Sequence, residues 1–281
     1  MDSSTLALLR DLGPGNPSFE PLGGGTCSRV LRVRWDGGRS VVVKIASPET
    51  SDEQLPSEAE ALRTLSIPHG PRIPRVFEAT ASALVLEDLG SAAPSVDFWE
   101  KLAEGLATIH GVRGPAFGFH RTTWLGATPL DNSWTDDGWA FHGARRIRPL
   151  LARAFDLGLL ERQDLKRGER LCGRLRERIP DAPPVLVHGD LWRGNVLADA
   201  AGEPALVDPA VHYGWAEADL AMTALFGGFP PGFLRLCAEA SGLEHRWTER
   251  VPCYNLVHLL NHLVLFGASW SAPVREILDR E

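Results

Sequence analysis

The sequence predicts an α+β protein of two lobes, with a small β-rich N-terminal lobe containing one key helix and a larger, mostly helical C-terminal lobe. Short runs rich in β-branched residues, separated by turn residues, follow one another as far as Glu87. Beyond Gly90 the apolar residues mostly recur at helical spacing. This change of pattern divides the chain into residues 1–88 and 89–281.

Size and composition narrow the possible functions. A chain of 281 residues can form one large or two modest domains. Its net charge of -7 gives no basic surface for nucleic acid or an anionic membrane. Four scattered cysteines and the lack of a visible signal peptide favour the reducing cytoplasm. The most apolar segment, Leu256 to Phe266, is too short to span a bilayer. The oligomeric state stays open.

The N-terminal lobe begins with a predicted short helix over residues 3–11, followed by the glycine-rich segment 23–28. Strands are expected over 29–35 and 39–46, because Asp36-Gly37 between two β-rich runs is a strong hairpin signal. Consecutive glycines let backbone N–H groups approach a phosphate closely, although most glycine runs are only loops.

Lys44 and Glu58 are predicted to pair between the second strand and the helix expected over 51–66. Alternation along the strand places Lys44 on the same face as Val42. Glu58 falls on the apolar face of the helix, where an unpaired carboxylate would be costly. The alternatives are a solvent-facing lysine on an edge strand and a half-exposed Glu58 at the margin of the apolar face.

Further strands are expected over 75–79 and 83–87, and then a helix over 95–110. The long segment 111–138 contains four aromatic residues, which either pack on the helical lobe or line an acceptor site. Helices are predicted over 139–157 and 160–179. Residues 231–281 are predicted to be helices that act only as a scaffold.

The stretch 185–208 carries the chemistry. Asp190 follows an apolar run, Asn195 follows five positions later, and Asp208 closes a second apolar run. Phosphoryl transfer needs a carboxylate to accept a hydroxyl proton and oxygen ligands to hold Mg²⁺ on the phosphates of a nucleotide. This spacing is that of a protein-kinase catalytic loop and metal-binding Asp. Taken singly, Asp and Asn at strand ends are most often turn residues. Asp219 is expected to brace this loop.

The chain resembles the fructosamine-3-kinase (ketosamine kinase) family, within the aminoglycoside-phosphotransferase-like kinases of the protein-kinase-like superfamily. The resemblance rests on several segments between about residues 20 and 230. They are His188-Gly-Asp-Leu-Trp-Arg-Gly-Asn195, Val207-Asp-Pro-Ala210, Tyr213-Gly-Trp-Ala-Glu-Ala-Asp-Leu-Ala-Met222, Leu225-Phe-Gly-Gly-Phe229, Phe117-Gly-Phe119, Trp124-Leu-Gly-Ala-Thr-Pro129 and Asn132-Ser-Trp-Thr-Asp-Asp137.

The resemblance implies a protein-kinase-like fold and ATP-dependent phosphorylation of the 3-hydroxyl of a ketosamine, which is a sugar joined to an amine. The unstable 3-phosphate would then release the amine, so the result is deglycation of small amines or proteins. The first lobe would bind the nucleotide, and the second would bind the acceptor and carry out catalysis.

The resemblance also implies roles for single residues. Asp190 would be the base, Asn195 and Asp208 would bind Mg²⁺, and Asp219 would be structural. The nucleotide would be held by Gly23, Gly24, Gly25, Thr26, Cys27, Ser28, Val42, Lys44, Glu58, Glu87 and Leu89. The acceptor would contact Trp192, His188, Arg193 and Glu217, although Trp192 could instead serve loop packing and His188 could instead hold the loop.

Two residues depart from the family pattern. Arg193 stands where relatives often have a small residue, and it could contact the phosphates, contact the acceptor or face solvent. Cys27 lies one place after a position where some relatives carry a cysteine. A thiol exposed near backbone N–H groups would be oxidisable, so oxidant-dependent loss of activity should vanish in Cys27→Ser.

Two other functions are weighed against a ketosamine kinase. One is a kinase of the same superfamily that acts on an aminoglycoside, a choline-like amine or an amino alcohol. The other is a nucleotide-binding protein without catalysis. A true protein kinase is disfavoured, because the chain has no Asp-Phe-Gly and no Ala-Pro-Glu.

Overall fold

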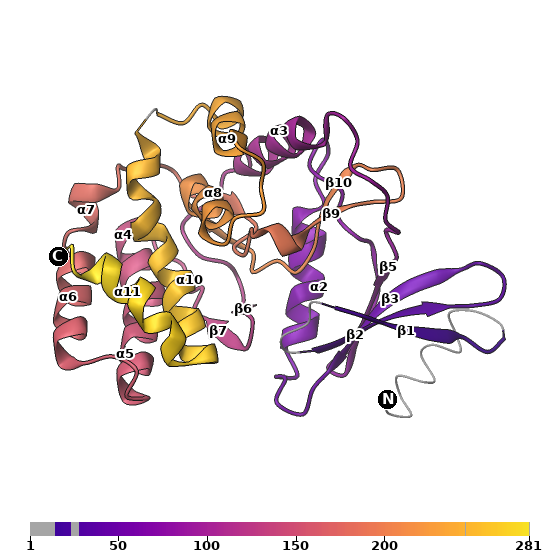
Figure 1. The fold of residues 1–281 in the computed structure, drawn as a ribbon, viewed down its shortest axis with the longest axis horizontal. Coiled ribbons are helices and arrows are strands. Elements are labelled where there is room, and N and C mark those ends of the chain that lie inside the picture. Colours follow the sequence, from indigo (N-terminus) through magenta and orange to yellow (C-terminus); the bar gives the residue numbers. More distant parts are fainter. Residues whose placement is uncertain (1–14, 24–27, 245, 281) are drawn as a thin grey trace.

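The computed structural model describes residues 15–23, 28–244 and 246–280, and Figure 1 shows their arrangement. The helix predicted over 3–11 lies outside the described residues. The same is true of four of the predicted nucleotide contacts, Gly24, Gly25, Thr26 and Cys27. The ends of that segment, Gly23 and Ser28, are described.

The N-terminal lobe is a five-stranded antiparallel sheet of order β1-β2-β3-β5-β4 with one helix beside it. Its elements are β1 (Ser18–Leu22), β2 (Ser28–Arg34), β3 (Ser40–Ala46), α2 (Gln54–Leu65), β4 (Val76–Ala79) and β5 (Ala83–Glu87). The four predicted strands and the predicted helix are present. The sequence did not predict β1, an exposed edge strand containing Pro21, which only an edge position tolerates.

Strand alternation gives the sheet two different apolar faces. Val41 and Val43 of β3 pack with Leu31, Val33 and other residues on the face away from α2. Val42 packs on the opposite face, in the core that contains the buried residues of α2. Lys44 shares the parity of Val42, so its side chain is directed toward α2 and the second lobe.

The C-terminal lobe is mostly helical (Figure 1). Its helices are α3 (Phe98–His110), α4 (Gly138–His142), the π-helical turn η1 (Gly143–Ile147), α5 (Arg148–Asp156), α6 (Arg162–Gly173), α7 (Leu175–Arg178), the 3-10 turn η2 (Arg193–Asn195), α8 (Ala216–Leu225), α9 (Phe233–Ser241), η3 (Trp247–Arg250), α10 (Val251–Phe266), η4 (Ala268–Trp270) and α11 (Ser271–Leu278). The helices predicted over 139–157 and 160–179 are each divided into shorter pieces.

Three short antiparallel pairs of strands complete this lobe. They are the hairpin β6 (Thr123–Leu125) and β7 (Thr128–Leu130), the pair β8 (Val185–Val187) and β11 (His212–Gly214), and the pair β9 (Val196–Ala198) and β10 (Pro204–Leu206). The first pair lies inside the segment predicted to be a long loop. The strands β8 and β10 end where the catalytic loop and Asp208 begin, so they fix the position of both.

Two large apolar cores hold the molecule together. One contains buried residues of α2, β5, α3 and α9, and therefore joins the two lobes. The other lies among α5, α6, α10 and α11. Helix α10, although rich in leucine, has 16 residues and carries the buried polar side chains Asn255, His258 and Asn261. None of the described helices is long and apolar enough to cross a membrane. Because β5 ends at Glu87 and α3 begins at Phe98, we propose residues 1–88 and 89–281 as the two lobes.

Candidate active site

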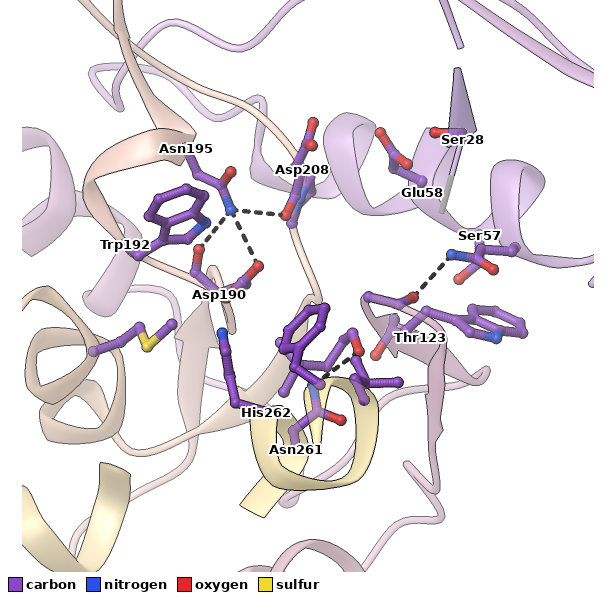
Figure 2. A pocket seen from close by; sticks show the side chains of 18 of the residues that line it. Ser28, Ser57, Glu58, Thr123, Asp190, Trp192, Asn195, Asp208, Asn261 and His262 are labelled. Carbon is purple, nitrogen blue, oxygen red and sulfur yellow. Dashed lines mark hydrogen bonds between the residues drawn. The ribbon is translucent and has the colours of Figure 1, made fainter. Parts of the chain in front are cut away.

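A cavity of about 420 Å³ lies where the two lobes meet, and Figure 2 shows its wall. The N-terminal lobe contributes Lys44 and Glu58, and the catalytic segment contributes Asp190, Asn195 and Asp208. The β6–β7 hairpin and the helices α8 and α10 form the remaining wall. The structure thus brings together, at one cavity, residues from distant positions that the sequence predicts as the base, the metal ligands and the phosphate-binding lysine.

The backbone of the catalytic loop is held by Asp219, in the first turn of α8. Its carboxylate accepts hydrogen bonds from the N–H groups of His188 at 2.6 Å and Gly189 at 2.8 Å. It also lies 3.2 Å from the Nε2 atom of His110. Burial alone would raise the pKa of Asp219, but His110 and the backbone donors outweigh it and lower that pKa. Asp219 therefore stays ionised and fixes the loop that carries Asp190.

Gly189 has a backbone conformation that only glycine adopts easily. Its φ is +81°, and a Cβ at this position would overlap the carbonyl oxygen of Ala210. The amide of Ala210 in turn donates to the carbonyl of His188 at 2.9 Å. This close approach explains why the position that is Arg in protein kinases is Gly here.

Asn195 connects the proposed base to the segment that carries Asp208. Its Nδ2 donates to the Asp190 carbonyl at 2.8 Å and to the Asp190 carboxylate at 3.2 Å. The same nitrogen lies 3.4 Å from the carbonyl oxygen of Asp208. No hydrogen bond among the described residues uses the other atom of the amide, Oδ1. That oxygen is therefore available to a cation.

The carboxylate of Asp190 has a raised pKa of about 7. Burial is the largest cause, and the nearby negative charge of Asp208 adds to it, while the hydrogen bond from Asn195 opposes both. A carboxyl group with such a pKa can accept a proton near neutral pH, as a general base must.

Lys44 lies between two carboxylates from different lobes. Its Nζ is 2.5 Å from Glu58 Oε1 and 2.6 Å from Asp208 Oδ1. The side chain is buried, which disfavours its charge, but the two carboxylates outweigh burial and raise the pKa of Lys44. Burial also raises the pKa of Glu58 in spite of this partner.

The donor set near Asp208 suits Mg²⁺. Asp208 has φ +57°, unusual for a residue with a side chain, and sits directly after β10 and Val207. The described residues contain no group of three His, Cys, Asp or Glu side chains that could hold a metal unaided. Mg²⁺ is typically held by one or two protein oxygens together with nucleotide phosphates and water, and Asn195 and Asp208 offer such a partial set.

The opposite wall of the cavity is formed by the β6–β7 hairpin, which lies in the segment for which the sequence left a lining role open, and by α10, which the sequence did not assign to the site. Thr123, Trp124, Leu125 and Gly126 come from the β6–β7 hairpin, and Asn261, His262, Leu265, Phe266 and Trp270 come from α10 and the turn after it. Asn261 fixes the two relative to each other, because it accepts from Thr128 Oγ1 at 2.5 Å and donates to the Leu125 carbonyl at 3.1 Å.

Two predictions about these segments change as a result. Residues 231–281 are not only a scaffold, which corrects the sequence-based prediction. The sequence did contain a signal, since polar Asn261 and His262 interrupt an apolar helix and buried polar groups need a partner or a role. In segment 111–138 both proposed roles occur: Phe117 and Phe119 pack in the interior, whereas Trp124 lines the cavity.

Three predicted acceptor contacts are not on this wall. His188 has no exposed surface; its Nδ1 accepts from the Asp190 N–H and its Nε2 donates to the Val207 carbonyl, so we reassign it to holding the loop. Glu217 binds Arg250 and the Tyr254 hydroxyl. The Arg193 guanidinium donates to the Val196 carbonyl at 2.5 Å. Both are reassigned to structural contacts, whereas Trp192 does line the cavity.

Three predicted nucleotide contacts also lie off the cavity wall. Val42 is half-buried in the core that joins the lobes. The carboxylate of Glu87 accepts from Arg72 at 2.8 Å, and the Leu89 carbonyl accepts from the Ala200 N–H at 2.8 Å. By contrast, Ser28, Lys44 and Glu58 line the cavity.

Comparison with known proteins gives a consistent result. The family model described as fructosamine kinase matches residues 10–281. A protein named probable ketoamine kinase from Enterococcus faecium is 34% identical over 273 residues, which are 94% of this chain and 95% of that protein. The chloroplastic protein-ribulosamine 3-kinase of Arabidopsis thaliana is 30% identical over 273 residues, covering 92% of this chain and 80% of that protein.

A solved structure agrees with the sequence relatives. The crystal structure of a protein assigned as a fructosamine-3-kinase, from Thermobifida fusca, matches with a TM-score of 0.84 and 30% identity. The match covers 94% of this chain and 92% of that one. It confirms the predicted two-lobed α+β fold of the kinase-like class.

Proposed function

The chain belongs to the fructosamine kinase family, and we propose which of its residues carry out the reaction. The family makes this protein an ATP-dependent phosphotransferase that acts on a hydroxyl group of ketosamines and so promotes deglycation. The proposal is that Asp190 accepts the proton of the sugar 3-hydroxyl while the γ-phosphoryl group of ATP is transferred to its oxygen.

The observation that carries this proposal is the joint presence of Asp190, Asn195, Asp208 and Lys44 on one cavity wall. Asp190 supplies a carboxylate whose pKa of about 7 suits proton transfer near neutral pH. Lys44 supplies a buried positive charge for the phosphates. When bound, Mg²⁺ would neutralise phosphate charge, and Asn195 Oδ1 and the Asp208 carboxylate would hold it together with those phosphates.

ATP binding must change which groups the ammonium of Lys44 contacts. This ammonium group contacts both Glu58 and Asp208. We infer that the phosphates take the place of Asp208 at Lys44, which frees that carboxylate for the cation. Glu58 then keeps Lys44 in position, and Gly23 and Ser28 lie at the two ends of the segment that would cover the phosphates.

The wall away from Lys44 favours a ketosamine over an aminoglycoside. The acidic residues among the described lining residues are Glu58, Asp190 and Asp208, and two of these are paired with Lys44. A polycationic aminoglycoside would need further carboxylates to replace its hydration. A sugar needs apolar ring faces and few polar groups, and Trp192 with the hairpin and α10 residues provides them.

The experiment is Mg-ATP turnover with a panel of acceptors that includes fructosamines, ribulosamines, an aminoglycoside, a choline-like amine and an amino alcohol. Turnover confined to ketosamines supports the proposal. Turnover only with the other acceptors would favour the alternative within the superfamily, and nucleotide binding without any turnover would favour a non-catalytic protein. We propose the cytoplasm as the compartment, and free ketosamines or glycated protein amines as the acceptors.

A further inference from the structure

Five aromatic rings form a continuous wall on the acceptor side of the cavity. Phe226 lies at its centre, with ring centroids 6.2 Å from Trp192, 4.9 Å from His262 and 5.9 Å from Trp270. His262 also lies 5.2 Å from Phe266 and 4.7 Å from Trp270. All five residues line the cavity, and Trp192, Phe226 and Phe266 keep 38%, 36% and 51% of their surface exposed. Exposed rings gathered in this way usually mark a binding surface.

The hydrogen bond that His262 makes within α10 determines its tautomer. Its Nδ1 lies 2.8 Å from the His258 carbonyl oxygen, which can only accept, so Nδ1 must carry the proton. In the neutral ring Nε2 then has a free lone pair. Within the described part of the chain, no hydrogen bond to Nε2 is formed. In Figure 2 the ring extends from α10 toward Asp190, into the cavity.

The surroundings keep His262 neutral. Burial lowers its pKa, and the hydrogen bond to the His258 carbonyl opposes this only in part. Its neighbours on the wall are the uncharged rings of Phe226, Phe266 and Trp270. The charged lining residue toward which the ring extends is Asp190, which carries no positive charge. The wall therefore offers a hydrogen-bond acceptor and several ring faces, and it presents no positive charge.

This combination matches a protonated amine. An ammonium group donates hydrogen bonds and is attracted to the negative faces of aromatic rings, whereas a sugar hydroxyl gains only the hydrogen bond. A ketosamine carries its secondary amine on a carbon near the 3-hydroxyl, so both groups fit within one cavity of about 420 Å³. The amine is positively charged near neutral pH.

We propose that His262 Nε2, within the wall formed by Trp192, Phe226, Phe266 and Trp270, binds the protonated amine of the acceptor and determines the specificity of the enzyme for amine-linked sugars. This inference rests on the proposed function and deepens it. Asp190 receives the hydroxyl proton, and His262 selects sugars that carry a protonated amine on C1, the carbon bonded to the anomeric centre. Phe266, the most exposed ring of the wall, lies where the group attached to the amine leaves the cavity.

The test compares two acceptors that differ only in charge, a 1-alkylamino fructose and the corresponding neutral 1-O-alkyl ether. We measure kcat/KM for both with the wild-type protein, His262→Phe and His262→Gln. His262→Phe keeps a ring but removes the acceptor, so the preference for the amine should fall about tenfold to a hundredfold, through KM. His262→Gln supplies a carbonyl acceptor and should keep part of the preference.

A matched control is His120→Phe, which changes a histidine outside the cavity wall and should leave the preference unchanged. Equal preference in the wild type and in both His262 variants would overturn the inference, while turnover of ketosamine would leave the proposed function intact. If the wild type turned over neither acceptor, the proposed function itself would fail. Nucleotide affinity, measured by calorimetry, should be unchanged in folded His262 variants, and a loss of it would show that the substitution acts through the fold.

Discussion

The ammonium group of Lys44 lies 2.6 Å from the carboxylate of Asp208, although the two residues are far apart in sequence and belong to different lobes. The contact joins the two lobes at the site and balances the charge of a buried lysine. It also places Asp208 beside the position where phosphates must bind.

Replacing Lys44 with Met should leave Glu58 as a buried carboxylate without its partner. We expect a loss of about 3–5 kcal/mol in the free energy of unfolding, because removal of one member of a buried ion pair is strongly destabilising. The kcat should fall by about 10²–10³, since a charge that stabilises the transferring group is lost. Urea unfolding and steady-state assays measure the two effects.

Lys101 provides the matched control for this substitution. It also contacts two carboxylates, Asp97 and Glu203, but all three side chains are well exposed to solvent. Lys101→Met should change neither stability nor kcat measurably. Equal losses in the two variants would contradict the role given to Lys44.

Asp219→Asn should reduce kcat while the KM for ATP changes little. The amide cannot accept from both backbone N–H groups of the loop, because its NH₂ group would face one of them. Stability should fall by about 1.5–3 kcal/mol, as expected for lost hydrogen bonds to a charged group. Asp199→Asn is the control, in a turn off the cavity wall. Asp199 accepts from the Ala201 and Glu203 amides through Oδ1 and from Arg72 through Oδ2, and the substitution loses the Arg72 contact. It should be destabilised without a change in kcat.

Gly189→Ala should disturb the catalytic loop more than the strain of a positive φ at this position alone would. The added Cβ overlaps the Ala210 carbonyl, so the loop must move, and a shift of about 1 Å in a reacting group can cost about 10²-fold in rate. Gly158→Ala has a similar φ of +71° but meets nothing within 4 Å. It should cost about 1 kcal/mol in stability and leave the rate unchanged. Equal rates for the two variants would refute this account of Gly189.

The stability of the protein without nucleotide and metal should depend on pH through Asp190. Its folded pKa of about 7 is above the value of about 3.9 in an unfolded chain. Between these values the folded state holds a proton that the unfolded state has released, so stability falls as pH rises from about 4 to 7. Asp190→Asn removes this loss of stability, because an amide does not titrate in this range. Its Tm should exceed that of the wild type by at least about 2 °C at pH 8, and the difference should shrink toward pH 5.

The features that the sequence predicted well are those determined by local pattern. Alternation along β3 placed Lys44 on the side of Val42, and helical spacing placed Glu58 on the inner face of α2. The structure has both, with the two side chains in contact. The hairpin at Asp36-Gly37 also joins β2 and β3 as predicted.

The features that the sequence did not predict depend on tertiary contacts. The hairpin β6–β7 has strands of only three residues, too short to show a period of two. Helix α10 is apolar on nearly every side, which is typical of a buried helix. Its pattern marks Asn261 and His262 as unusual but does not show that His262 and Phe266 face a cavity. For the same reason, the sequence does not show whether His188 is buried or contacts an acceptor. The answer depends on how β8, β10 and α8 pack around this side chain.

We propose that Asp190 accepts the proton of the ketosamine hydroxyl in a site that binds Mg-ATP. The most direct measurement is formation of ketosamine 3-phosphate from Mg-ATP, followed by phosphorus NMR, in the wild type and in Asp190→Asn, together with the nucleotide Kd of each. We predict product with the wild type, at least about 10²-fold slower formation with Asp190→Asn, and a Kd for Mg-ATP within about threefold of the wild-type value. Product formation by Asp190→Asn at the wild-type rate would contradict the claim.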